Sequence, residues 1–151
     1  MLDATTQTAE FIRTFEASLD PMLWEKLVKE ELAELSEALL GTDRAHVLKE
    51  AADLVYVTTP FMGIMETMGS LDYLSEDRID AANALIEKVD KKLAVAISIF
   101  GEDIINEAIQ LVHESNMSKL GEDGKPIRRE DGKILKGPNY KEPDLSELVK
   151  Q

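Results

Sequence analysis

The chain contains no cysteine, few aromatic residues and no long uncharged hydrophobic run. Because none of its 151 residues is cysteine, disulfides and thiolate catalysis are excluded. No stretch approaches the ~18 uncharged apolar residues of a membrane span, and the N-terminus lacks the basic and apolar segments of a secretory signal. We therefore expect a cytoplasmic protein of one domain that does not contact a membrane and buries a core without cross-links.

Basic residues are also scarce. The sequence has 17 Lys and Arg against 30 Asp and Glu, a formal net charge of −13. This balance argues against a nucleic-acid polymer as the partner, because such binding requires clustered Lys and Arg. The excess acid lies in residues 1–120, whereas residues 121–151 are balanced and contain a basic stretch at 124–141.

Helix signals dominate the first 120 residues. Asp20, which precedes a proline, and Asp43 and Ser75 are typical N-caps. Hydrophobic residues at helical spacing predict five helices, over about residues 4–18, 21–41, 44–68, 76–99 and 102–119. Pro60 is expected to bend the third helix without ending it. The sequence therefore predicts an all-α fold, an antiparallel helical bundle.

After Gly121 the sequence changes to turn residues. Short apolar segments flank Asp131-Gly132, which predicts a small hairpin there. We therefore expect a helical catalytic domain over residues 1–120, and a short irregular basic C-terminal extension over 121–151 that is part of the same domain.

Two acidic pairs lie symmetrically about a turn. Glu31 and Glu34 precede the turn at residues 41–43, and Glu50 and Asp53 follow it. In antiparallel helices that rise ~1.5 Å per residue, the two pairs come level with each other. In each pair one residue, Glu31 or Glu50, lies within the apolar face of its helix, and the other, Glu34 or Asp53, lies at the edge of that face. Acidic residues that only form a solvated helix face are not expected at such positions.

Four facing carboxylates are typical of a site for a hard divalent cation. Two such charges ~4 Å apart repel by ~4 kcal/mol at an effective dielectric constant near 20, and a cation offsets this repulsion. The chain offers no cysteine and no Gly-x-Ser-x-Gly elbow that would favour a covalent nucleophile. We therefore predict a magnesium enzyme, with Mn²⁺ as the alternative cation.

The acidic pattern resembles the signature of the all-α nucleoside triphosphate pyrophosphohydrolases. Glu30-Glu31-x-x-Glu34 followed by Glu50-x-x-Asp53 is similar to the motif of MazG-like proteins, dimeric dUTP pyrophosphatases and phosphoribosyl-ATP pyrophosphohydrolases. The C-terminal part resembles small phage and bacterial members annotated with phosphoribosyl-ATP pyrophosphohydrolase-like activity, in the segments HESNMSK (113–119), DGKP (123–126) and DGKILKGP (131–138).

The resemblance implies hydrolysis of a nucleoside triphosphate to the monophosphate and pyrophosphate. It implies that Mg²⁺ is held by Glu31, Glu34, Glu50 and Asp53. The catalytic residues would be Glu30, Glu31 and Glu34, with Glu30 orienting the attacking water or supporting the metal ligands. Because phosphoryl transfer depends mostly on positioning and charge neutralisation, a carboxylate cage suits this reaction.

The sequence leaves the substrate open. The tail favours a bacterial or phage enzyme that acts on GTP, dGTP, dUTP or non-standard nucleotides in the cytoplasm of a bacterium or an infected host. Phosphoribosyl-ATP pyrophosphohydrolase of histidine synthesis is the closest enzymatic alternative. A non-catalytic nucleotide-binding helical protein is the alternative from another functional class.

Basic and amide side chains are the candidates for binding the substrate. Asn116 and Lys119 are three residues apart and share a helix face. We expect Lys119 to contact phosphate, although a favourable charge at a helix C-terminus is an alternative role, and Asn116 to contact phosphate, sugar or base. Lys133 and Lys136 are further phosphate candidates on a segment that is expected to close over the substrate. Asn83, on the fourth helix, is another candidate.

Relatives in this family assemble as dimers or tetramers with sites between subunits, so the resemblance implies a homodimer or homotetramer. Met62, Met65 and Met68 on the long third helix would suit such an interface if they are exposed. Their alternative role is ordinary core packing.

Overall fold

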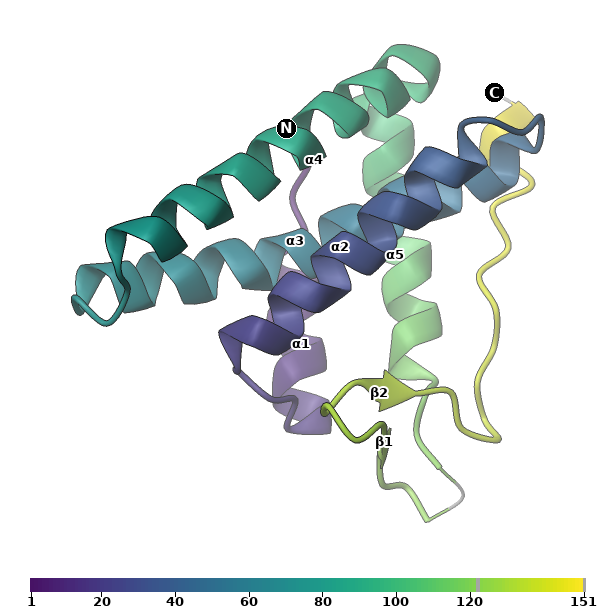
Figure 1. Cartoon of the computed structure of the whole chain (residues 1–151). Coiled ribbons are helices and arrows are strands. Elements are labelled where there is room, and N and C mark those ends of the chain that lie inside the picture. The colour runs from purple at the N-terminus through teal and green to yellow at the C-terminus, as the bar shows by residue number, and fades with distance from the viewer. Residues whose placement is uncertain (122, 151) are drawn as a thin grey trace.

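The computed structural model describes residues 1–121 and 123–150 of the chain (Figure 1). Helices make up most of this part, and the strands form one small sheet. The elements are α1 (Thr5–Phe15), α2 (Pro21–Ala38), α3 (Arg44–Ser70), α4 (Glu76–Phe100), α5 (Glu102–Met117), β1 (Ile127–Arg128), β2 (Ile134–Leu135) and the 3₁₀ turn η1 (Leu148–Lys150). The predicted all-α class is confirmed.

Three helices begin at the predicted caps. The side chains of Asp20, Asp43 and Ser75 accept hydrogen bonds from backbone N–H groups two or three residues later, at 2.9, 3.1 and 3.2 Å. Each cap satisfies one of the N–H groups that a helix start leaves unpaired. These short polar residues therefore fix where α2, α3 and α4 begin.

Some helix ends differ from the prediction. α1 ends at Phe15 because Glu16 adopts a left-handed conformation with φ 48°. α2 ends at Ala38, three residues before Gly41, in a turn that leads to the Asp43 cap. α3 runs through Pro60 without a break, as predicted.

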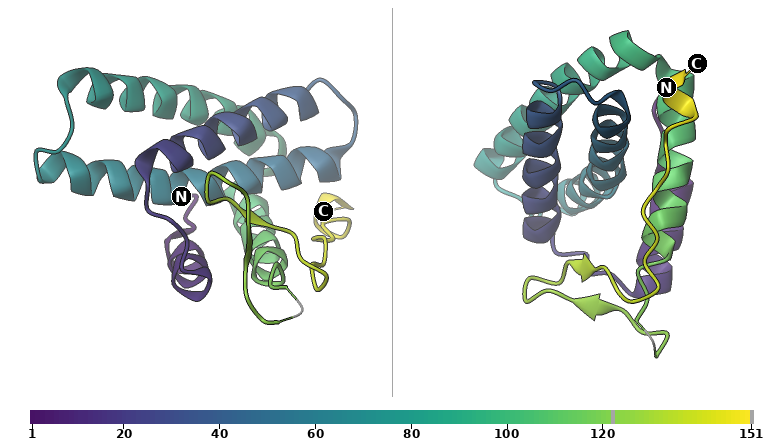
Figure 2. Two further views of the ribbon diagram at one scale, coloured as in Figure 1. Left: turned by 60° about the horizontal axis from the view of Figure 1, so that its bottom comes forward. Right: turned by 90° about the vertical axis from the view of Figure 1, so that its right-hand side faces the viewer.

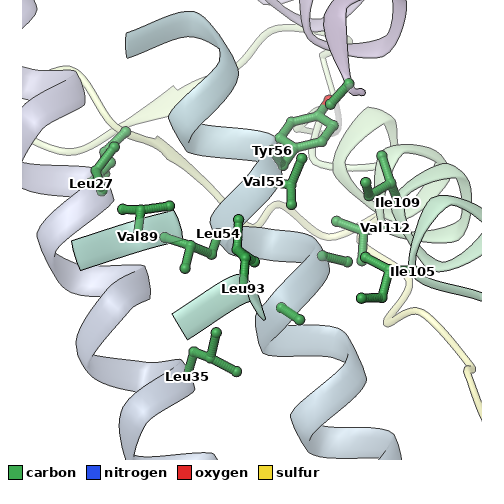
Figure 3. Close-up of a cluster of buried hydrophobic side chains, with 14 of the residues drawn as sticks. Leu27, Leu35, Leu54, Val55, Tyr56, Val89, Leu93, Ile105, Ile109 and Val112 are labelled. Atoms are coloured by element: carbon green, nitrogen blue, oxygen red, sulfur yellow. The ribbon is translucent and has the colours of Figure 1, made fainter. Parts of the chain in front are cut away.

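α3 is the central helix of the fold. It contacts the other four helices and η1. α4 packs on α2 and α3, while α1 and α5 pack on α3 and against each other (Figure 2). The core contains buried side chains from all five helices and from the C-terminal segment. Figure 3 shows part of it, with Leu27, Leu35, Leu54, Val55, Val89, Leu93, Ile105, Ile109 and Val112 among the labelled residues. Burying this apolar surface is the main favourable contribution to folding.

The C-terminal segment packs against the helices. β1 and β2 pair antiparallel about the predicted Asp131-Gly132 turn, so the predicted hairpin is confirmed. The Arg128 guanidinium donates to the backbone oxygen of Phe15 at 2.7 Å, and Ser115 Oγ donates to the backbone oxygen of Lys141 at 2.6 Å. These contacts hold the hairpin and the chain after it against α1 and α5.

The three methionines of α3 are not one exposed cluster. Met62 is 46% exposed, whereas Met65 is buried and Met68 is half-buried. The exposure expected for Met65 is therefore wrong, because this side chain faces the core. Within residues 1–121 and 123–150, no helix combines the length and the hydrophobicity that a membrane span requires.

Candidate functional site

Three of the four predicted carboxylates meet between α2 and α3. One oxygen each from Glu31, Glu50 and Asp53 lies within 4.8 Å of the others. Glu50 is only 4% exposed, while Glu31 and Asp53 are half-buried. Glu34 is exposed and lies outside this triad, but its carboxyl group is near enough to raise the pKa of both Glu31 and Glu50.

The surroundings of these carboxylates oppose their negative charge. Burial, followed by repulsion from Asp53 and Glu34, raises the pKa of Glu31 to about 9. Burial also raises the pKa of Glu50 to about 6, although Lys49 opposes that rise. Burial and mutual repulsion both disfavour the ionised form of these carboxyl groups. A positive charge added between them would therefore stabilise the ionised carboxylates.

Two buried oxygen atoms fit a divalent cation at this position. Within the described part of the chain, Oε2 of Glu31 and Oε2 of Glu50 are buried and have no hydrogen-bond partner. Buried oxygens without partners are costly, and carboxylate oxygens are the ligands that Mg²⁺ and Mn²⁺ prefer. Glu31, Glu50 and Asp53 therefore form a donor set that suits such a cation, with Glu34 beside them.

Lys49 was not predicted as a site residue. Its Nζ atom lies 2.7 Å from Asp53 Oδ2 and 3.4 Å from Glu50 Oε1. Burial is the largest single influence and opposes its charge, but the combined attraction of Asp53, Glu50 and Glu31 outweighs burial and raises the pKa of Lys49 above its ordinary value. The signal that indicates Lys49 in the sequence is its spacing of four residues before Asp53.

A cavity of about 450 Å³ opens beside the carboxylates. α2 and α3 supply its acidic side with Glu31, Glu34 and Asp53, and also Lys49. The end of α5 and the hairpin segment supply polar and basic residues, which are Ser115, Asn116, Lys119, Lys133 and Lys136. Apolar and aromatic side chains complete the lining, among them Phe11, Leu23, Trp24, Leu27, Tyr56, Ile134 and Tyr140.

The structure brings four of the five predicted substrate residues to this cavity. Burial lowers the pKa of Lys119 to about 8, in spite of the attraction of Asp53. Lys136 Nζ lies 4.8 Å from the centre of the Tyr140 ring, a cation–π contact. Asn83 does not line the cavity and is exposed on α4.

Trp24 both belongs to the core and lines the cavity. It is 4% exposed, and its indole Nε1 donates to the backbone oxygen of Ser18 at 2.7 Å. This bond fixes the orientation of the ring.

Tyr56 and Tyr140 also line the cavity, and sequence reasoning missed both. Tyr56 follows Asp53 by three residues and therefore shares its helix face.

Glu30 contacts the hairpin and is not among the residues that line the cavity. Its carboxylate oxygens lie 3.3 Å from Arg129 Nη2 and 3.4 Å from Lys133 Nζ. Nearby, Lys26 of α2 pairs with Asp131 of the hairpin at 2.8 Å. The geometry therefore gives Glu30 contacts that hold the hairpin on α2. Its predicted role, orienting the attacking water or supporting the metal ligands, stays a prediction.

Glu30→Gln is expected to loosen the hairpin without disturbing the carboxylates. Glutamine keeps the size of the side chain but removes the charge that faces Arg129 and Lys133. We expect faster hydrogen exchange over residues 127–136, and a KM for the substrate raised by about two- to fivefold, the effect of a partly exposed ion pair. Glu37→Gln, an exposed position on the same helix, is the control. Unchanged exchange in the hairpin would contradict this role.

One comparison with known proteins covers the part of the chain that supplies the carboxylates. Residues 1–69 match the family model for phosphoribosyl-ATP pyrophosphohydrolase. The searches of curated proteins and of solved structures found no match. The resemblance that we noted in segments after residue 112 lies outside the matched range and stays a prediction. Residues 1–69, which supply all four carboxylates, are therefore similar to the phosphoribosyl-ATP pyrophosphohydrolases, in agreement with the resemblance of the acidic motif.

Proposed function

We propose that the protein is a Mg²⁺-dependent nucleoside triphosphate pyrophosphohydrolase that converts an NTP or dNTP to the monophosphate and pyrophosphate. The observation that carries this proposal is one cavity, whose lining combines the carboxylates of α2 and α3 with Lys119, just after α5, and with Lys133 and Lys136 of the hairpin segment. A triphosphate needs both, because its oxygens bind a cation held by carboxylates and also bind ammonium groups directly.

In the proposed reaction, water attacks the α or the β phosphorus and the bond between the α and β phosphates breaks, which gives the monophosphate and pyrophosphate. A divalent cation held by Glu31, Glu50 and Asp53 would supply positive charge against the phosphate oxygens and lower the pKa of the attacking water. Glu34, whose carboxyl group lines the cavity beside these residues, accepts the proton of that water. Lys119, with Lys133 and Lys136, neutralises the remaining phosphate charge.

The apolar part of the cavity suits the nucleoside. Trp24 and Tyr56 give it aromatic surface, and the side chains of Leu23 and Leu27 add aliphatic surface. A nucleobase buries a flat apolar surface against such side chains, while the triphosphate remains at the charged end. The cavity volume, about 450 Å³, is in the range of sites for small-molecule ligands.

Phosphoribosyl-ATP is the second candidate substrate. The family model that matches residues 1–69 is that of phosphoribosyl-ATP pyrophosphohydrolase. The reaction on this substrate also releases pyrophosphate, so the same carboxylates and lysines serve it. The two candidates differ in what the cavity must accommodate beyond the triphosphate, since phosphoribosyl-ATP carries an additional phosphorylated sugar.

A nucleotide panel tests the proposal. The common and deaminated NTPs and dNTPs, together with phosphoribosyl-ATP, are incubated with the protein and Mg²⁺, and monophosphate and pyrophosphate are quantified. We expect selective turnover of one nucleotide, which stops when EDTA removes the cation and resumes with Mg²⁺ or Mn²⁺. Turnover of phosphoribosyl-ATP alone would establish the second candidate. Nucleotide binding without any turnover would establish a non-catalytic binding protein.

A further inference from the structure

Lys49 contacts the carboxylates and also lines the cavity. Its Nζ atom donates to Asp53 Oδ2 at 2.7 Å and to Glu50 Oε1 at 3.4 Å. The Lys49 side chain is 35% exposed and forms part of the cavity wall. His46 Nδ1 lies 3.6 Å from the same Glu50 oxygen, but His46 is not among the described residues that line the cavity. Lys49 therefore places a positive charge between two of the carboxylates and the space proposed for the substrate.

The geometry of α3 brings Lys49 to this position. Lys49 precedes Glu50 directly and Asp53 by four residues, so Lys49 and Asp53 lie one helical turn apart on the same face. One ammonium group offsets only part of the charge of three carboxylates. Oε2 of Glu50 stays buried without a hydrogen-bond partner although Lys49 contacts Oε1 of the same group. Lys49 is therefore an incomplete counter-ion for a group of carboxylates that suits a divalent cation.

Lys49 and a divalent cation compete for the same carboxylates. Glu50 and Asp53, which Lys49 contacts, are two of the three members of the proposed donor set. A cation bound to them repels the ammonium group, and salt screens this repulsion only weakly at partly buried positions. The lysine stem is flexible and this side chain is not enclosed by the core, so its ammonium group can leave Asp53 without disturbing the packing.

We propose that Lys49 is the counter-ion of these carboxylates, that a divalent cation displaces its ammonium group into the cavity, and that the displaced ammonium group binds phosphate there. The inference rests on the proposed function and deepens it, because it adds a phosphate-binding residue and an order of binding. The ammonium group becomes available to phosphate only after the cation has bound. Cation and phosphate therefore each increase the affinity of the protein for the other.

Calorimetric titration of the nucleotide-free protein with Mn²⁺ tests the competition. Lys49→Met keeps an unbranched side chain and removes the charge, and we expect it to raise the affinity for Mn²⁺ by about tenfold, the worth of one hydrogen bond to a charged group. Lys49→Arg keeps the charge and is expected to stay within about threefold of the wild type. Lys91→Met is the matched control, because Lys91 Nζ lies 3.2 Å from Glu87 Oε1 across one turn of α4, at an exposed position.

The displacement is observed in the wild-type protein by ¹⁵N NMR of the lysine ammonium groups. An ammonium group that is hydrogen-bonded to a carboxylate exchanges its protons more slowly than a free one. Lys49→Arg removes the signal of Lys49 and keeps the charge, so it assigns that signal. We expect addition of Mg²⁺ to shift the Lys49 signal and to speed its proton exchange, and to leave the signal of Lys91 unchanged.

Inorganic pyrophosphate is the probe for the phosphate contact. It is titrated into the protein at saturating Mg²⁺, so that differences in cation affinity do not contribute. We expect Lys49→Met to bind pyrophosphate about tenfold more weakly than the wild type, because one charge-assisted hydrogen bond is lost. Lys91→Met should bind it as the wild type does. A purely structural role of Lys49 would not strengthen the binding of Mn²⁺ and weaken the binding of pyrophosphate in the same variant.

The outcomes separate this inference from the proposed reaction. Unchanged or weaker Mn²⁺ binding in Lys49→Met, or a Lys49 signal that Mg²⁺ leaves unchanged, would overturn the displacement. Pyrophosphate binding equal to that of the wild type would overturn the phosphate contact. These results leave the proposed reaction standing, since the nucleotide panel tests it independently. Absence of Mn²⁺ binding in the wild type and in every variant would overturn the cation site together with this inference.

Discussion

Asp53→Asn is expected to reduce kcat/KM for the nucleotide by at least about 10²-fold, a typical effect of removing one group that stabilises transition-state charge. The substitution keeps the shape of the side chain and removes one of the three carboxylates that lie within 4.8 Å of one another. It also leaves the Lys49 ammonium, 2.7 Å from Asp53 Oδ2, without its closest anionic partner. Both changes weaken the binding of a divalent cation.

Cation binding and catalysis are measured separately for this variant. Calorimetric titration with Mn²⁺ reports the affinity of the carboxylates for the cation, and steady-state kinetics at saturating Mg²⁺ report the reaction. Glu37→Gln removes an exposed carboxylate from α2 and is the control, with both quantities expected to equal those of the wild type. Wild-type affinity together with wild-type turnover in Asp53→Asn would refute the proposed role of this carboxylate group.

Glu31→Gln is expected to stabilise the protein in EDTA. The folded protein raises the pKa of Glu31 from its ordinary value of 4.5 to about 9. Between these two pH values the folded state binds a proton that the unfolded state has released, so stability falls as pH rises from about 4.5 to about 9. Glutamine does not titrate and carries no charge to repel Asp53 and Glu34. The variant should therefore lose less stability over this range.

The expected difference is about 2 kcal/mol near neutral pH, or roughly 4–8 °C in Tm for a chain of this length. Thermal unfolding followed by circular dichroism between pH 5 and 9 in EDTA measures it. Mg²⁺ should raise the Tm of the wild type more than that of the variant, because the variant lacks one ligand. Parallel Tm curves for the two proteins across this pH range would count against the repulsion assigned to Glu31.

The acidic half of the site could be predicted because it depends on local geometry. Two helices joined by a short turn at 41–43 must lie side by side, and the rise per residue then sets which residues come level. The caps at Asp20, Asp43 and Ser75 are local as well, since each side chain bonds a backbone group two or three residues away. Short-range rules of this kind can be applied to a sequence directly.

The remaining contacts join residues far apart in the sequence. Glu30 meets Lys133 across 103 residues, and Tyr56 meets His113 across 57. No periodicity encodes such distances, because they depend on how the hairpin and α5 pack on the first three helices. The ion pairs of Glu30 with the hairpin were therefore not predicted, and Tyr56 was missed as a residue of the cavity.

The cavity is built from two separate lengths of chain. Residues 1–69, which match the family model, supply the carboxylates and Lys49, while the C-terminal part supplies Lys119, Lys133, Lys136, Asn116 and much of the remaining lining. The residues proposed to bind the cation and the residues proposed to bind the nucleotide therefore come mostly from different parts of the sequence. Exchange of the C-terminal segment between relatives is a route to a new nucleotide preference that leaves the cation-binding carboxylates untouched.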